Sequence, residues 1–214
     1  MLDFEDVQDC YFTAKDVVEG FINDQLYTYS RTPIEFLTHF NYENFCEEKL
    51  DFDFAPYKFK KLSKQVGGSL YIDNDDVVIS YDINNSKSRQ AFTKLHEIYH
   101  YFGHYKMGIK GNYFGQSINN NTLGYEELIL EQEANFGASF MQISDKGLAK
   151  CFIDKLSYSQ ICNSYNMSYS ALYNRLLSFL IFEKDINESI ARNAINKYRY
   201  SYNNTELKQL FFRQ

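Results

Sequence analysis

The chain has 214 residues, of which 44% are apolar, 23% are charged and two are proline. This length suits one domain with a sizeable core, or one domain plus a small helical appendage, and the composition excludes disordered, collagen-like and linker-rich proteins. The net charge of −6 argues against nonspecific binding to nucleic acids. Residues 1–144 carry −10 and residues 145–214 carry +4, so the two parts are expected to meet different partners or each other.

Both ends of the chain and its cysteines favour a cytoplasmic protein. The acidic start, MLDFEDVQDC, lacks the basic residues of a secretory signal, and no long apolar run follows it. The apolar run LLSFLIF near the C-terminus is too short to span a bilayer. Reduced thiols are expected rather than a disulfide, because no CxxC pair occurs among Cys10, Cys46, Cys151 and Cys162.

Helical signals occupy residues 1–48. Thr13 is the expected N-cap of a helix over TAKDVVEGFINDQ, whose apolar residues recur on one side. Thr32 is the expected cap of a second helix, with Pro33 at its first position and Glu35 three residues after the cap.

Residues 49–82 are expected to form a small sheet of about three strands, antiparallel or mixed. LDFDF alternates in polarity, and GSLYID and VVISYDI flank the turn NDD. A helix is predicted to begin near NNSKSRQ and to run through HEIYH. Residues 106–124 hold four glycines and four asparagines and are expected to be a long loop, which in a compact domain is often functional.

A second long helix is predicted over YEELILEQEANFGASFMQI, and shorter helices fill the rest of the chain. The order of helices, small sheet and helices predicts an α+β fold. We expect an N-terminal helical region at 1–48, a core at 49–145, and a C-terminal helical region at 146–214 packed on the core.

The stretch HEIYH, residues 96–100, predicts a metal site. His96 and His100 are four residues apart, which on a helix is about 40° in projection and about 6 Å along the axis. Both can therefore bind one ion, and zinc accepts histidine nitrogens at about 2.0–2.1 Å. Glu97 points beside the ion, where its carboxylate can accept a proton from a water molecule. The alternative is a chance arrangement of surface histidines.

Spacing within the HEIYH segment does not supply a third ligand. The metzincin pattern H-E-x-x-H-x-x-G-x-x-H fails, because Gly103 fits it but Lys106 stands where the third histidine is needed. His104 lies about 12 Å from His96 along a continuous helix, too far to share one ion. It is expected to be exposed or to contact a ligand from outside.

A glutamate from the second long helix is the other source of a ligand. That helix offers Glu126, Glu127, Glu131 and Glu133. Glu131 and Glu133 point about 200° apart, so only one of them can face the site. Asn135, one turn after Glu131, can hydrogen-bond a ligand from outside. Ala134, Gly137 and Ala138 are small, as a close approach of two helices requires. The alternative is an ordinary amphipathic helix with a glutamate-rich solvent face.

The stretch SRQAFTKLHEIYHYFGHY, followed by EQEANFGASFMQI, resembles the ImmA/IrrE family of zinc metallopeptidases. The family pattern is R-x-x-F-T-x-x-H-E-x-x-H and then E-x-E-A-N-x-F-A-A, and the resemblance covers about residues 50–180. The matching residues are Arg89, Phe92, Thr93, His96, Glu97, His100, Glu131, Glu133, Ala134 and Asn135. By this resemblance Glu131 is the third zinc ligand. The chain departs from the pattern at Gly137, where the family has Phe, in the long loop, and in FMQIS, which lacks the usual proline.

The resemblance implies a zincin-like, cytosolic, zinc-dependent endopeptidase. Family members are typically encoded beside a helix-turn-helix repressor of mobile elements or stress genes, and they relieve repression by cleaving that repressor. The expected partner is therefore a protein substrate of this kind, and no membrane is expected to take part. The alternative is a non-proteolytic zinc-binding regulator, or a toxin-like partner of a repressor.

The segment LSYSQICNSYNMSYSALYNRLLSFL is itself similar to a helix-turn-helix. Its expected N-caps are Ser157 and Ser168, and its expected core is Ile161, Leu172 and Leu176. DNA binding requires basic residues on the second helix, and only Arg175 is present there. A structural helical pair is therefore favoured over direct DNA binding.

Overall fold

The structure is a computed structural model that describes residues 1–24, 27, 41–58, 66–74, 76–109, 113–117, 124–201 and 203–213. The chain forms two compact units, Met1–Gln142 and Ile143–Gln214. The first unit contains the sheet and the HEIYH segment, and the described part of the second is helical. The finer division into regions 1–48, 49–145 and 146–214 stays a prediction.

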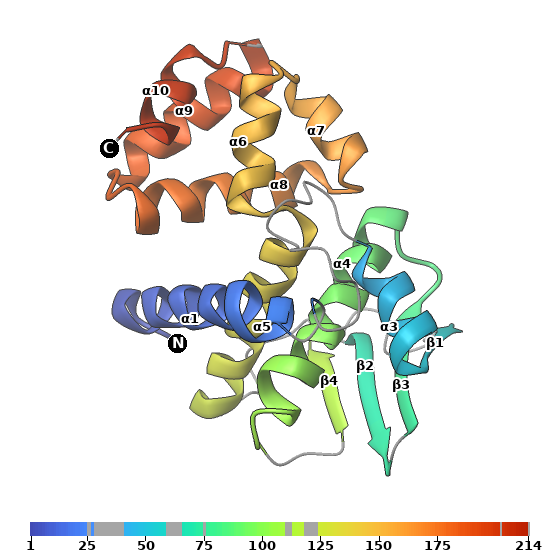
Figure 1. Cartoon of the computed structure of the whole chain (residues 1–214). Coiled ribbons are helices and arrows are strands. Elements are labelled where there is room, and N and C mark those ends of the chain that lie inside the picture. The colour runs from blue at the N-terminus through green and yellow to red at the C-terminus, as the bar shows by residue number, and fades with distance from the viewer. Residues whose placement is uncertain are drawn as a thin grey trace. The chain divides into compact units, whose positions relative to one another are not determined.

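Within the described residues, the sheet of the first unit is mixed and has four strands in the order β1-β3-β2-β4 (Figure 1). The strands are β1 (Phe52–Tyr57), β2 (Val66–Asp73), β3 (Asp76–Asp82) and β4 (Tyr113–Ser117). β1 is parallel to β3, whereas β2 is antiparallel to β3 and β4. The α+β fold class is therefore confirmed, as is the predicted β2–β3 hairpin. The fourth strand lies in the segment that was expected to be a loop.

Helices cover the sheet and pack on one another in the first unit. They are α1 (Phe4–Asp16), the π-helix η1 (Val17–Ile22), α3 (Tyr42–Leu50), α4 (Lys87–Tyr99), the π-helix η3 (His100–Tyr105) and α5 (Tyr125–Gln142). α4 packs on β2 and β3 and also on α5, while α1 packs on α5. Figure 1 shows α4 between the sheet and α5. α4 is therefore covered by the sheet and by a helix.

The start of the first helix differs from the prediction. Asp3, not Thr13, is the N-cap of α1, and its side chain forms a capping box with Asp6. Two reciprocal hydrogen bonds satisfy two backbone amides at that end, so the helix begins at Phe4 and Thr13 lies inside it. The cap predicted at Thr32, with Pro33 and Glu35, lies outside the described residues. The start of α4 was predicted correctly, since Ser86 caps it.

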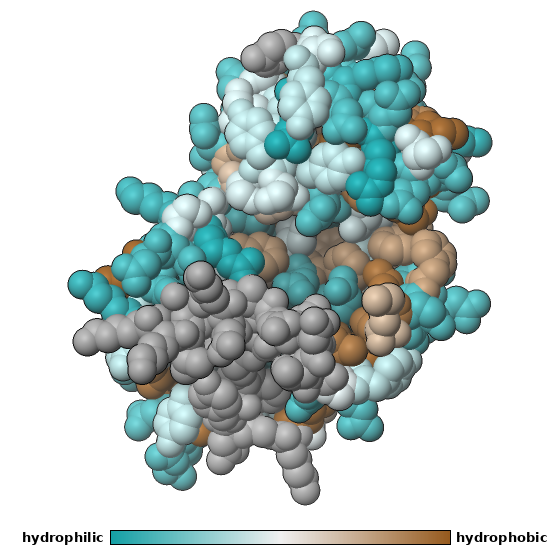
Figure 2. Space-filling view, turned by 180° about the vertical axis from the view of Figure 1, so that it is seen from behind, coloured by the Kyte–Doolittle hydropathy of each residue, from teal (hydrophilic) through white to brown (hydrophobic). Residues whose placement is uncertain are grey.

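The second unit is a bundle of short helices. They are α6 (Asp145–Ile153), α7 (Tyr158–Ser164), α8 (Tyr169–Ser178), the π-helix η5 (Phe179–Glu183), α9 (Glu188–Ser201) and α10 (Thr205–Phe211). The predicted caps Ser157 and Ser168 are confirmed, since each accepts a backbone N–H three residues on. The predicted core residues Ile161, Leu172 and Leu176 are fully buried. On the face drawn in Figure 2, hydrophilic residues cover most of this unit.

Arg175 is buried in this second unit although it carries a charge. Its Nε donates to the carbonyl oxygen of Ile143 at 3.1 Å, and its guanidinium pairs with Asp145 at the start of α6. The side chain of Arg175 is 1% exposed. The one basic residue noted on α8 therefore ties α8 to the start of α6 and is not presented to a nucleic acid.

All four cysteines are buried and form no disulfide. Among the described residues, no helix has the length and apolar character needed to cross a bilayer.

Candidate metal centre

The HEIYH segment brings two histidines together at the junction of α4 and η3. His96 lies in the last turn of α4, and His100 is the first residue of η3, which continues the helix. Their Nε2 atoms are 3.0 Å apart. His96 is 0% exposed and His100 is 1% exposed, so neither is a surface histidine.

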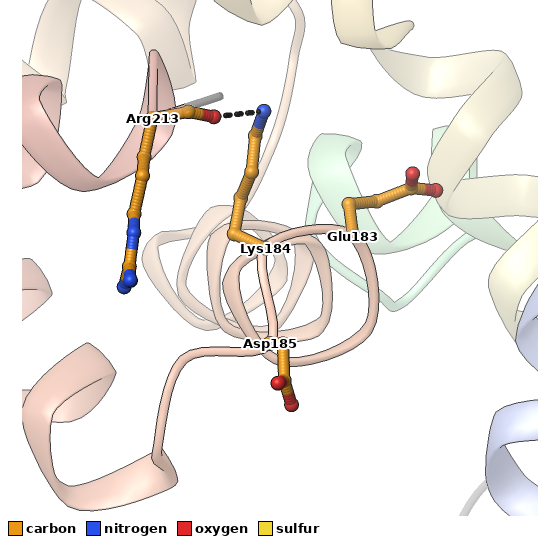
Figure 3. A pocket seen from close by; sticks show the side chains of 4 residues that line it. All are labelled: Glu183, Lys184, Asp185 and Arg213. Atoms are coloured by element: carbon orange, nitrogen blue, oxygen red, sulfur yellow. Dashed lines mark hydrogen bonds between the residues drawn. The ribbon is translucent and has the colours of Figure 1, made fainter.

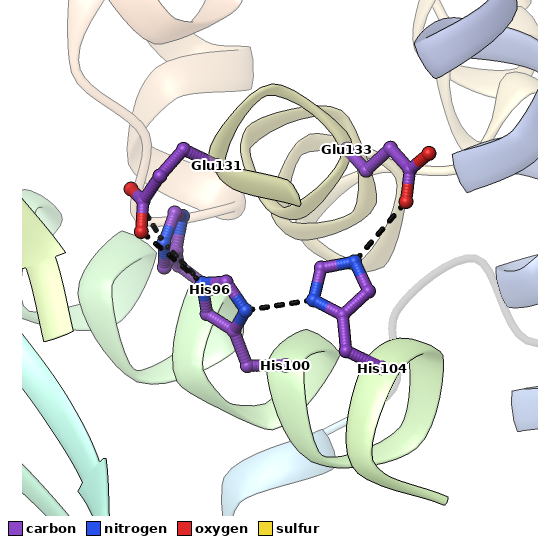
Figure 4. A network of polar contacts seen from close by, with 5 residues as sticks. All are labelled: His96, His100, His104, Glu131 and Glu133. Carbon is purple, nitrogen blue, oxygen red and sulfur yellow. Dashed lines mark hydrogen bonds and ion pairs between the residues drawn. The ribbon is translucent and has the colours of Figure 1, made fainter. Parts of the chain in front are cut away.

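Glu131 of α5 completes a group of three metal-ligating side chains (Figure 4). Its two carboxylate oxygens lie 3.5 Å from Nε2 of His96 and 3.6 Å from Nε2 of His100. A tetrahedral zinc ion with bonds of 2.0–2.1 Å holds its ligand atoms about 3.3 Å apart. The three observed separations are close to that value, and one ligand atom of each residue lies within 4.8 Å of the others, so the three side chains are near enough to share one ion.

The electrostatics of this group favour the protonation states that a metal needs. Burial lowers the pKa of His100 to about 3, so its ring is neutral near pH 7. Burial opposes ionisation of Glu131, but hydrogen bonds with His100 and His96 outweigh it and lower the pKa to about 2. Neutral imidazole and ionised carboxylate are the forms that bind divalent zinc.

Glu97 lies beside this group and against the sheet. Its side chain is fully buried. A Cβ added at Gly68 of β2 would lie 3.2 Å from Oε1 of Glu97 and 2.3 Å from the methyl carbon of Thr93. The missing side chain at Gly68 therefore allows β2 to approach α4 closely where it carries the Glu97 carboxylate.

His104 is neither exposed nor isolated. It is 0% exposed, and its Nδ1 lies 2.8 Å from Nδ1 of His100. On the other side, its Nε2 lies 3.1 Å from Oε2 of Glu133. Figure 4 shows Glu131 and Glu133 on opposite sides of α5, with the three histidines along the facing helix. Of the two expectations for His104, exposure was wrong and contact with a ligand is what the structure has.

The spacing of four residues places His104 beside His100, as it places His100 beside His96. The segment that carries His104 is the π-helix η3, in which the N–H of Lys106 donates to the carbonyl of Tyr101, five residues earlier. His104 is buried because η3 packs against η1 and α5. The spacing of His100 and His104, together with the second acid of E-x-E, was the sequence signal for this contact. Within the described residues, no hydrogen bond joins the Asn135 side chain to this group.

Small residues let α5 approach α4, as predicted. Ala134 and Ala138 are fully buried. A Cβ added at Gly137 would lie 1.9 Å from Cδ2 of Tyr99, and one added at Gly103 would lie 2.7 Å from Cε1 of the same ring. The Tyr99 ring therefore fills the space between two glycines.

A family comparison matches this architecture. The model of the Peptidase_M78 family, described as the IrrE N-terminal-like domain, matches residues 57–177, which is more than half of the chain. The chain belongs to the ImmA/IrrE peptidase family. No curated protein matches the chain at a significant level. All three members of the ligand group lie within the range that the family model covers.

One departure from the ImmA/IrrE pattern has a structural explanation. The pattern places Phe where this chain has Gly137, and the Tyr99 ring occupies the space that a side chain at Gly137 would take. A larger residue at position 137 would not fit beside this ring.

A pocket in the second unit lacks the chemistry of the metal centre. It has a volume of about 310 Å³ and is lined by Glu183, Lys184, Asp185 and Arg213 (Figure 3). Lys184 Nζ donates to the carbonyl oxygen of Arg213 at 2.8 Å. The lining has two acids and two bases and includes no histidine or cysteine, so we assign it no function.

Proposed function

We propose that the protein is a zinc-dependent endopeptidase. The observation that carries this proposal is the group of His96, His100 and Glu131, whose ligand atoms lie within 4.8 Å of one another, inside the range matched by a peptidase family. Zinc bound there supplies a Lewis acid that polarises the peptide carbonyl and lowers the pKa of a water molecule. The substrate is a protein, as membership of a peptidase family implies.

The side chains of the proposed site have different roles. His96, His100 and Glu131 would hold the ion. Glu97, next in sequence to His96, accepts a proton from the attacking water and then passes it to the leaving amine. Its carboxylate is held between α4 and β2, where Gly68 leaves room for it, so it is positioned before the substrate arrives.

A helix-turn-helix repressor is the substrate we propose, in the cytoplasm, with relief of repression of a mobile element or of stress genes as the result. This part rests on the family resemblance. The C-terminal helices are proposed as structural rather than DNA-binding, because Arg175, the basic residue noted on α8, is buried against Asp145.

A Glu97→Gln variant tests the mechanism. The repressor encoded beside the gene is incubated with zinc-loaded wild-type and variant proteins, and fragments are followed by mass spectrometry. We expect the variant to keep its zinc and to lose about 10²-fold or more in cleavage rate, because the amide cannot accept the proton. A variant that retains zinc and cuts at the wild-type rate would refute the mechanism.

The same variant separates proteolysis from a binding function. If the protein acts as a non-proteolytic zinc-binding regulator, Glu97→Gln relieves repression fully and no repressor fragment forms. If it acts as a peptidase, repression persists with the variant and fragments form only with the wild type.

A further inference from the structure

A buried chain of polar contacts extends from the metal centre to the far side of α5. It runs from His100 through His104 to Glu133, with separations of 2.8 and 3.1 Å (Figure 4). His104 is fully buried, and the side chain of Glu133 is 14% exposed. Hydrogen bonds in such a low-dielectric environment are stronger than at the surface, and leaving one of these groups unpaired is costly.

Once a metal is bound, the positions of the ring hydrogens determine which atom donates and which accepts in these two hydrogen bonds. His100 must present the lone pair of Nε2 to the ion, so the hydrogen of its neutral ring resides on Nδ1. That N–H donates to Nδ1 of His104, which must therefore be the acceptor. The hydrogen of the His104 ring then resides on Nε2 and donates to the carboxylate of Glu133.

The opposite arrangement of the ring hydrogens would prevent His100 from binding the ion. If His104 carried its hydrogen on Nδ1, it would donate to Nδ1 of His100. The hydrogen of the His100 ring would then reside on Nε2, and that atom could not bind an ion. A carboxylate has no hydrogen to donate when ionised, so Glu133 selects the tautomer of His104 that leaves His100 ready for metal.

We propose that His104 and Glu133 are positioning residues that hold His100 in its metal-binding tautomer and orientation. This proposal rests on the proposed metal site. His96 provides an internal contrast, because its Nδ1 is buried and has no hydrogen-bond partner among the described residues. Variants at Glu133 are therefore expected to disturb His100 and to leave the tautomer of His96 unchanged.

The first test is the zinc affinity of the full-length chain, measured by competition with a chromophoric chelator. Glu133→Gln keeps the size of the side chain but removes the charge and adds a donor, so we expect zinc binding to weaken about 10- to 100-fold. Glu133→Asp retains the carboxylate and is expected to bind more tightly than Glu133→Gln. Glu126→Gln is the matched control, because Glu126 is exposed on the same helix. Equal affinities for Glu133→Gln and Glu126→Gln would overturn the proposal.

The second test observes the protons directly. Two-dimensional ¹H–¹⁵N NMR of the histidine rings in the zinc-loaded wild type should show His100 protonated at Nδ1 and His104 protonated at Nε2. Glu133→Leu offers the His104 ring no acceptor, so we expect it to lose the preference for the hydrogen on Nε2 of His104, whereas a merely structural role for Glu133 would leave both tautomers unchanged. Finding the His104 hydrogen on Nδ1 in the wild type would overturn the proposal.

Failure of this proposal is distinguishable from failure of the proposed function. If the wild type binds no zinc, both are wrong. If it binds zinc and Glu133→Gln binds equally well, only the positioning role is wrong. If Glu133→Gln weakens zinc binding while the zinc-loaded wild type cuts no repressor, the positioning role stands and the endopeptidase proposal does not.

Discussion

The contact between Gly137 and Tyr99 predicts that one methyl group will disturb the metal centre from a distance. In a Gly137→Ala variant the new Cβ would lie 1.9 Å from Cδ2, 2.4 Å from Cε2 and 2.5 Å from Cγ of Tyr99. Carbon atoms in contact are about 3.5 Å apart, so α5 or the ring must shift by about 1.5 Å. The ring has little room to move, because a Cβ at Gly103 on its other side would already lie 2.7 Å away.

The expected cost follows from two opposing effects. Overpacking a buried contact destabilises a protein by about 1–3 kcal/mol. Replacing Gly by Ala inside a helix returns about 1 kcal/mol through helix propensity. Because the shift required here is large, we expect a net loss of about 1–2 kcal/mol in the free energy of unfolding.

Metal binding should weaken together with stability. α5 carries both Glu131 and Glu133, so a displacement of about 1.5 Å from α4 lengthens their contacts with His96, His100 and His104. We expect the zinc dissociation constant to rise at least about 10-fold, which corresponds to about 1.4 kcal/mol.

Denaturant unfolding of the metal-free protein and chelator competition measure these two effects. Gly20→Ala is the control, because a Cβ at Gly20 meets no atom within 4 Å and the residue is exposed in a helical segment. That variant should be as stable as the wild type or more so, with unchanged zinc affinity. If Gly137→Ala behaves like Gly20→Ala in both assays, the reasoning about helix approach is wrong.

Three further predictions follow from individual side chains. Glu131→Gln should weaken zinc binding by more than the roughly 100-fold that is typical when a residue contacting a metal ligand is replaced. Retention of wild-type affinity would show that Glu131 is not a ligand. The metal-free protein should lose stability as pH falls from about 6.5 toward 3. In this range His100 is protonated in the unfolded chain, but in the folded state burial lowers its pKa to about 3 and keeps it neutral. The free energy of unfolding should fall by up to about 1.4 kcal/mol per pH unit. Denaturation midpoints measured across this pH range should show a flatter slope for His100→Leu than for the wild type. Arg175→Met should lower the free energy of unfolding of the second unit by about 3 kcal/mol, because it removes the buried partner of Asp145. Arg192→Met, which removes one side of an exposed ion pair, is the control and should cost less than about 1 kcal/mol in the same unfolding assay.

Local spacing was sufficient to predict the first half of the site. A four-residue interval on a helix places His96 and His100 together whatever the rest of the fold does. Glu131 required the family resemblance, because the neighbouring glutamates on the same helix offered the same chemistry. The small residues Ala134 and Gly137 correctly predicted a close approach but did not say which side chain would meet them.

The parts that the sequence did not predict depend on contacts between distant residues. Exposure of His104 was expected because its burial depends on the packing of η3 against η1 and α5, which lie far from it in the chain. Residues 113–117 form a strand because β2, far away in the chain, pairs with them, although the segment is rich in turn residues. Arg175 is buried because Asp145, 30 positions earlier, pairs with it.

The ligand group draws on two helices that are far apart in the chain, so a bound ion acts as a cross-link. Glu131 follows His100 by 31 residues. Tying two points of an unfolded chain across such a loop reduces its conformational entropy by an equivalent of about 4 kcal/mol. The two histidines form half of the site as soon as one helix exists, whereas Glu131 joins only when α5 docks. Metal captured by the two histidines during folding would therefore favour docking of α5 on α4.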